Sequence, residues 1–137
     1  MIVGIGIDLV DIARVARILK WREERALKRL FTFREIDYAR NKADPARHFA
    51  ARLAAKEATF KALAGNEKAR AIGWKDIEVV LHPDGRPALH LHGPAKLRAA
   101  ELNVTRSWVT LTHSETTAGA VVILETDPNP PALAVPE

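Results

Sequence analysis

Residues 49–64 form an apolar helical stripe that has a carboxylate inside it. Glu57 falls four residues after Leu53 and three before Phe60, so these three side chains point to nearly the same side of a helix. Lys61 follows one turn later, on the flank of that face. A half-buried carboxylate needs a paired cation, a bound proton or a metal ion. The stretch therefore predicts a long central helix whose side carries a polar site.

The hydrophobic periodicity predicts the other elements. A short strand is expected at residues 2–7, and helical spacing begins just after Asp8. Gly65 is expected to end the long helix. The remaining helices are expected at 34–41, 45–64 and 94–102, and the remaining strands at 77–81, 88–92, 107–112 and 118–124. This order indicates an α+β fold with a mainly antiparallel sheet packed against the long helix.

The first strand carries a second carboxylate. Gly4 and Gly6 share one face of this strand with Asp8, and they leave space in which a ligand could approach the backbone. Two acids from separate elements are a common way to hold Mg²⁺. Taken alone, Asp8 is more typical of a helix N-cap, and Glu57 is compatible with an ion pair to Lys61. Neither residue decides the matter alone, and together they form a candidate metal site.

Composition limits the class of protein. The chain has 137 residues, of which 47% are hydrophobic and 28% charged, so we expect one folded domain at 1–125. The segment 126–137 holds four of the eight prolines and is expected to be disordered. The absence of cysteine excludes disulfides and thiolate sites. Without a long apolar run or a signal-peptide pattern, we expect a cytoplasmic protein that does not enter a membrane.

Basic residues gather in the first predicted helix of a chain whose net charge is +4. This pattern favours an acidic partner, although a solvated helix face would look the same. Nucleic acid is the weaker candidate, because aromatic residues do not alternate with the basic ones. The basic residues are Arg14, Arg17, Lys20, Arg22, Arg25, Lys28 and Arg29.

Histidines offer one further candidate. His113 ends a predicted strand and is expected at the rim of the sheet, where it is either a site residue or an ordinary half-buried histidine. The spacing of His82, His90 and His92 does not predict a metal site.

Four segments, in the same order and at the same separations, resemble motifs of the holo-acyl-carrier-protein synthases, a family of 4′-phosphopantetheinyl transferases. The resemblance extends from residue 2 to about residue 124. Its most specific parts are the first and third segments. The segments are Gly4-Ile5-Gly6-Ile7-Asp8-Leu9-Val10-Asp11-Ile12, Phe31-Thr32-Phe33-Arg34-Glu35, Arg52 through Ala62, and Thr112-His113-Ser114-Glu115 followed by Ala118 and Ala120.

The resemblance implies the 4′-phosphopantetheinyl transferase fold and a Mg²⁺-dependent reaction. In that reaction 4′-phosphopantetheine passes from coenzyme A to a serine of apo-acyl carrier protein, and adenosine 3′,5′-bisphosphate is released. Asp8 and Glu57 would hold Mg²⁺ with the pyrophosphate, and Lys61 would contact phosphate. The general base would be Glu57 or a metal-bound water or hydroxide. Val10 stands where the larger transferases have an acid, so water would complete the metal shell.

The resemblance also implies how the partners bind. Arg52, Gly65 and His113 would contact coenzyme A, with Arg52 reaching phosphates held by a neighbouring subunit. Arg14 would dock the acidic helix of the carrier protein. The family forms trimers with an active site at each subunit interface, and it serves fatty acid biosynthesis.

Two alternatives remain open at this point. One is a non-catalytic basic module that binds an acidic protein or nucleic acid, with Asp8 and Glu57 purely structural. It accounts for the basic helix but not for Glu57 in the apolar stripe. The other is a Mg²⁺-dependent phosphotransferase that uses a different diphosphate.

Overall fold

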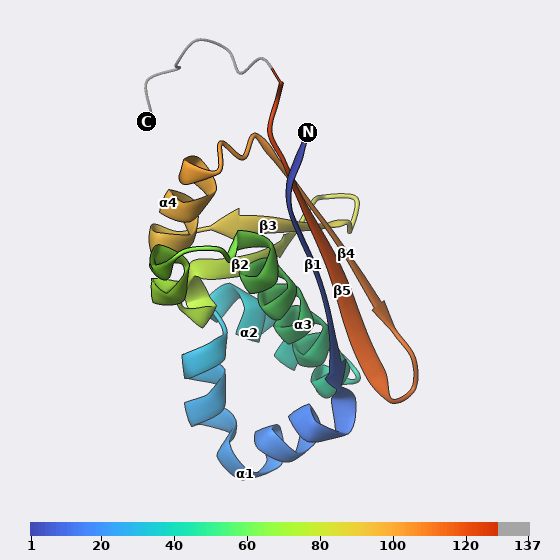
Figure 1. The fold of residues 1–137 in the computed structure, drawn as a ribbon. Helices are drawn as coiled ribbons and strands as arrows, with labels where there is room; N and C mark the ends of the chain where they lie inside the picture. Colours follow the sequence, from blue (N-terminus) through green and yellow to red (C-terminus); the bar gives the residue numbers. More distant parts are fainter. Residues whose placement is uncertain (129–137) are drawn as a thin grey trace.

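The computed structural model describes residues 1–128. The predicted tail therefore lies, from residue 129 onward, outside the described residues. The order of strands and helices agrees with the sequence prediction (Figure 1). The elements are β1 (Ile2–Asp11), α1 (Ile12–Leu30), α2 (Phe33–Arg40), α3 (Pro45–Leu63), β2 (Ile77–Leu81), β3 (Pro87–Leu91), α4 (Gly93–Glu101), β4 (Arg106–His113) and β5 (Thr117–Glu125), with short 3-10 helices at Glu67–Ala71 and Trp74–Asp76.

The described residues form two antiparallel sheets. The larger sheet has the strand order β1-β5-β4, and the smaller one pairs β2 with β3. Helix α3 crosses one face of the larger sheet, and the other helices lie on that same side (Figure 1). The predicted α+β architecture, an antiparallel sheet packed against a long central helix, is therefore confirmed. Within residues 1–128, no helix is long and apolar enough to cross a membrane.

Strand β1 is longer than the alternation predicted. It continues to Asp11 because it pairs with β5 along its whole length, and Asp11 lies opposite Thr117. The first helix therefore starts at Ile12, and the side chain of Asp11 caps it by accepting from the backbone N–H of Ala13 at 3.1 Å. Asp8, placed by the prediction next to the helix, lies inside the strand instead.

The space beside the two glycines of β1 is filled by the backbone of α3 and is not open to a ligand. A Cβ atom on Gly6 would lie 1.8 Å from the carbonyl oxygen of Ala58, and one on Gly4 would lie 2.3 Å from that of Ala62. The expectation of open space beside Asp8 was therefore wrong. The strand and the helix touch through their backbones, and this contact places Asp8 against α3.

Both ends of α3 are defined by local chemistry. Asp44 stands at the N-cap position before Pro45 but makes no capping bond, and it pairs with Arg47 at 3.1 Å. The helix ends at Leu63, and Gly65 follows with a φ of +131°, which suits glycine. Arg98 of α4 donates to the carbonyl oxygen of Leu63 at 2.8 Å and so satisfies one of the helix's last acceptors.

A buried ion pair anchors α3 to the rest of the core. Lys56 and Glu35 have fully buried side chains, and their charged atoms lie 2.8 Å apart. Lys56 also donates to the carbonyl oxygens of Trp74 and Ile77, and Glu35 also accepts from the backbone N–H of Val79. This network joins α2, α3 and β2, although the sequence analysis assigned neither ionic residue a role.

The second face of the larger sheet is apolar and open. Ile5, Ile7 and Leu9 alternate with the glycines of β1, and they are 63%, 62% and 69% exposed. Trp108 of β4 is 49% exposed. Within the described part of the chain no helix covers this face (Figure 1). Such a large exposed apolar surface is typical of an interaction site.

Candidate active site

The contact between β1 and α3 brings three predicted site residues together. The ammonium group of Lys61 donates to Asp8 Oδ1 at 3.0 Å and to the carbonyl oxygen of Ile7 at 2.9 Å. Lys61 therefore pairs with the acid on the strand. Among residues 1–128 no salt bridge joins it to Glu57, so the ion pair considered for the helix alone does not form.

The carboxyl groups of Asp8 and Glu57 shift each other's pKa in opposite directions. Burial, then the neighbouring carboxyl group of Asp8, raise the pKa of Glu57 to about 7, while Arg14 and Lys61 act in the opposite direction. Burial also acts to raise the pKa of Asp8, but the interaction with Glu57 and the hydrogen bond and charge of Lys61 outweigh it, so the pKa is lowered. In the metal-free protein at neutral pH, Asp8 is therefore ionised and Glu57 is partly protonated.

These two acids fit a hard divalent cation. Asp8 Oδ2 is buried and has no hydrogen-bond partner in residues 1–128, so one oxygen next to Glu57 lacks a ligand. The N-cap role considered for Asp8 belongs to Asp11. Carboxylate oxygens from two elements are the ligands that Mg²⁺ takes in phosphate-binding sites, with waters in the remaining positions.

Arg52 and His113 meet at a different place. They line a pocket of about 300 Å³ together with His48 and Tyr38. Arg52 lies with its guanidinium 4.3 Å from the centre of the Tyr38 ring, and its Nε atom has no partner in the described residues. Burial lowers the pKa of Arg52, against the opposing influence of Tyr38. His113 is the last residue of β4 and is exposed at the rim of the sheet.

Gly65 lies in a third place. It lines a pocket of about 440 Å³ with Phe60 and Asn66, after the end of α3. One chain thus holds the predicted residues in three groups: the Asp8, Glu57 and Lys61 cluster, the pocket of Arg52 and His113, and the pocket of Gly65.

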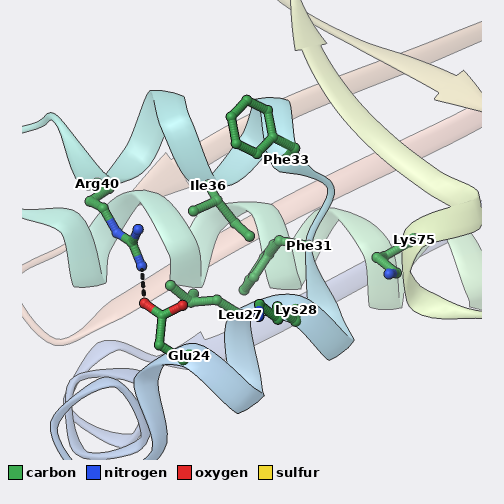
Figure 2. A pocket seen from close by; sticks show the side chains of 8 residues that line it. All are labelled: Glu24, Leu27, Lys28, Phe31, Phe33, Ile36, Arg40 and Lys75. Atoms are coloured by element: carbon green, nitrogen blue, oxygen red, sulfur yellow. Dashed lines mark hydrogen bonds and ion pairs between the residues drawn. The ribbon is translucent and has the colours of Figure 1, made fainter.

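The predicted docking residue Arg14 is exposed in the first turn of α1, near enough to Glu57 to oppose the rise of its pKa. All seven basic residues of α1 are exposed, and the helix bends at Arg22. Glu24 pairs with Arg40 of α2 at 2.8 Å beside a mainly apolar pocket that Lys28 also lines (Figure 2). The basic side of α1 therefore begins at the edge of the carboxylate site.

Known proteins that are similar to this chain in sequence and in fold identify its class. The 4′-phosphopantetheinyl transferase superfamily matches residues 4–121. The holo-[acyl-carrier-protein] synthase of Geobacter metallireducens is 44% identical over 125 residues, which cover 91% of this chain and 98% of the relative. The chain therefore belongs to the 4′-phosphopantetheinyl transferase superfamily. Within it, the resemblance to the holo-[acyl-carrier-protein] synthases is confirmed, and the chain is an enzyme of that transferase class.

Solved structures agree with this assignment. The holo-[acyl-carrier-protein] synthase of Neisseria meningitidis has a TM-score of 0.80 and 26% identity, and the match covers 92% of this chain and 100% of that one. The synthase of Helicobacter pylori, solved in complex with coenzyme A, has a TM-score of 0.74 and 28% identity over 88% of this chain and 99% of that one.

Proposed function

We propose that this protein transfers 4′-phosphopantetheine from coenzyme A to a serine of apo-acyl carrier protein and releases adenosine 3′,5′-bisphosphate. The observation that carries the proposal is the half-buried pair of Asp8 and Glu57, with an unpartnered carboxylate oxygen on Asp8, next to Lys61. The substrates follow from relatives named for this reaction and from one solved with coenzyme A.

In this proposal Asp8 and Glu57 hold Mg²⁺, which neutralises the charge that develops on the coenzyme A pyrophosphate. Lys61 is half exposed and already lies at the carboxylate pair, so its ammonium group can turn to a phosphate oxygen. The carboxylate of Glu57 lies beside Asp8 and Arg14, and we assign it the acceptance of the proton of the serine hydroxyl.

Acyl carrier protein would dock on the basic side of α1. Glu24 pairs with Arg40, whereas Arg14 and Arg17 have no salt bridge in residues 1–128. Exposed cations of this kind steer an acidic partner and raise its rate of association. Arg14, at the edge of the carboxylate site, would bring the serine of the carrier protein to Glu57.

The complete site would form between copies of the chain. Arg52 and His113 share a pocket that does not include the carboxylate cluster, and the apolar face of the sheet is open for association. A homotrimer joined through Ile5, Ile7 and Leu9 would cover that face. Arg52 and His113 of one copy would then contact the coenzyme A held at the carboxylates of the next.

The reaction is tested by the intact mass of apo-acyl carrier protein after incubation with this protein, coenzyme A and Mg²⁺. We expect a gain of one 4′-phosphopantetheine, which EDTA abolishes and Asp8→Asn reduces at least about a hundredfold. No gain with several carrier proteins would refute the proposed reaction and favour a non-catalytic basic module. A gain that resists EDTA would refute the metal assignment.

The shared site is tested by mixing two inactive variants, Asp8→Asn and Arg52→Ala, under conditions that exchange subunits. If each site combines two copies, random mixing restores roughly a quarter of the sites. If each chain holds a whole site, no activity returns. Single-variant samples carried through the same exchange serve as controls.

A further inference from the structure

Three metal-ligating side chains meet on the smaller sheet, away from the carboxylate site. Glu78 of β2 lies directly opposite His90 of β3, and His92 follows two residues after His90, just beyond the end of the strand. One ligand atom from each residue lies within 4.8 Å of the other two. The spacing of the histidines did not predict this cluster, because its third member comes from the neighbouring strand.

The carboxylate of this cluster is buried and oriented. Glu78 is only 6% exposed. Its Oε2 atom accepts a hydrogen bond from the hydroxyl of Thr32 at 2.5 Å. Its Oε1 atom faces both imidazoles, at 3.1 Å from His92 Nε2 and 3.9 Å from His90 Nδ1. A carboxylate held through one oxygen, with the other facing imidazole nitrogens that can bind the same ion, is the usual arrangement of a metal ligand with its supporting hydrogen bond.

The two histidines are placed to complete a ligand set. Their ring centres lie 4.2 Å apart. His92 stands at the N-cap position of α4, yet its side chain makes no capping bond and contacts Glu78 instead. The His90 and His92 side chains are 57% and 42% exposed, so an ion can reach them from solvent.

We propose that Glu78, His90 and His92 form a binding site for a divalent transition-metal ion, with Zn²⁺ as the best fit. Two imidazoles and one carboxylate are a common zinc ligand set, in which a fourth position stays open. Tetrahedral zinc places its ligand atoms about 3.4 Å apart, so His90 needs only a small side-chain rotation. The ion would tie β2 to β3 and, through Thr32, to the start of α2.

This site differs in chemistry from the Asp8 and Glu57 pair. Nitrogen donors favour Zn²⁺ and its neighbours in the transition series, whereas two carboxylates favour Mg²⁺. Besides His92, Arg34 of α2 and the buried ammonium group of Lys56 act on Glu78. The positive charge of Arg34 opposes a bound cation. Removing that charge should therefore strengthen metal binding.

The test is calorimetric titration of the metal-free protein with Zn²⁺, in excess Mg²⁺ so that the Asp8 and Glu57 pair is occupied. We expect one Zn²⁺ per chain. His90→Ala should weaken this binding at least about tenfold, since an exposed side chain is removed and the fold is kept. His82→Gln, in the same hairpin but outside the cluster, is the matched control and should bind Zn²⁺ normally.

Two further variants sharpen the test. Asp8→Asn should bind Zn²⁺ as the wild type does, and Arg34→Gln should bind it more tightly. Zn²⁺ should raise the unfolding temperature of the wild type but not of His90→Ala. Lack of Zn²⁺ binding, equal binding by wild type and His90→Ala, or loss of binding in Asp8→Asn would each overturn the proposal.

Discussion

Lys56 and Glu57 are neighbours on α3, but their charges are in opposite surroundings. The Lys56 ammonium group is fully buried and has three oxygen partners, among them the carboxylate of Glu35 at 2.8 Å. Glu57 is half-buried, carries a raised pKa of about 7, and stands beside an oxygen of Asp8 that has no partner in the described residues. Lys56 therefore has a full set of hydrogen-bond acceptors, whereas the carboxylate pair of Asp8 and Glu57 has an oxygen without a partner.

The comparison indicates which ionic group holds the fold, and it supports our proposal that the other acts on a ligand. A buried polar network is stable only when every member has a partner, and Lys56 and Glu35 meet this condition. A carboxylate pair that keeps an oxygen without a partner suits a bound cation, because a cation would favour the ionised form of both acids. Consecutive residues can differ in this way because they point about 100° apart around a helix.

Breaking the complete network should produce the largest effect on stability. Lys56→Met leaves the carboxylate of Glu35 buried without its cation, so we expect the free energy of unfolding to fall by about 3–5 kcal/mol. Urea titration measures this change. Lys61→Met, which removes a half-exposed ammonium, is the control and should lower the stability by less than about 1 kcal/mol. Equal losses in both variants would contradict the comparison.

The next effect should come from separating β1 and α3. Gly6→Ala forces a Cβ atom against the carbonyl oxygen of Ala58, and we expect a loss of about 1–3 kcal/mol in unfolding free energy. The rate of transfer should fall as well, because Asp8 moves relative to Glu57. Gly73→Ala, where the added atom meets only Asp76 Oδ2 at 3.4 Å, should change the stability by less than about 0.5 kcal/mol. Urea titration gives the unfolding free energy of each variant, and initial rates on the same samples give its rate of transfer. Equal values for Gly6→Ala and Gly73→Ala would contradict the expected role of Gly6.

The raised pKa of Glu57 should appear as a pH dependence of the stability of the metal-free protein. Between pH 4.5 and about 7 the unfolded chain has released the proton of Glu57 while the folded chain keeps it, because the pKa is raised from 4.5 to about 7. The unfolded state then binds fewer protons, so stability should fall as the pH rises through this window. In EDTA, the difference in unfolding free energy between wild type and Glu57→Gln should follow this slope. A flat difference would mean that the pKa of Glu57 is not raised in the folded protein.

The smallest effect is expected at the docking surface. Arg14→Glu should raise the KM for acyl carrier protein several-fold and weaken its salt dependence, since surface charges chiefly affect association. Arg106→Glu, an exposed charge reversal on β4, is the control. If both variants kept the wild-type KM, the basic side of α1 would be only a solvated face.

The sequence predicted the elements well because their signals are local. Helical spacing and Gly65 located α3 to within about two residues at each end, and alternation located four of the five strands within the described chain. The length of β1 was missed because it depends on pairing with β5, more than a hundred residues later in the sequence. Local alternation carries no information about such a partner.

The candidate site was predicted in its members but not in its arrangement. Asp8 and Glu57 were paired on chemical grounds, whereas the role of Gly6 in bringing them together follows only from the packing of two backbones. Lys56 and Glu35 were missed because a charged pair in the core looks, in a sequence, like two surface residues. The signal that could have revealed Lys56 is its position in an alanine-rich stretch of the sequence. In the structure these alanines are buried on every side of α3.

The central claim is that Glu57, and not its neighbour Lys56, is the reactive charge of α3. The most direct measurement is the rate of 4′-phosphopantetheine transfer by Glu57→Gln in excess Mg²⁺, taken together with its free energy of unfolding. We expect the rate to fall at least about a hundredfold while the stability stays within about 1 kcal/mol of the wild type. A variant that transfers at a near-normal rate would contradict the claim.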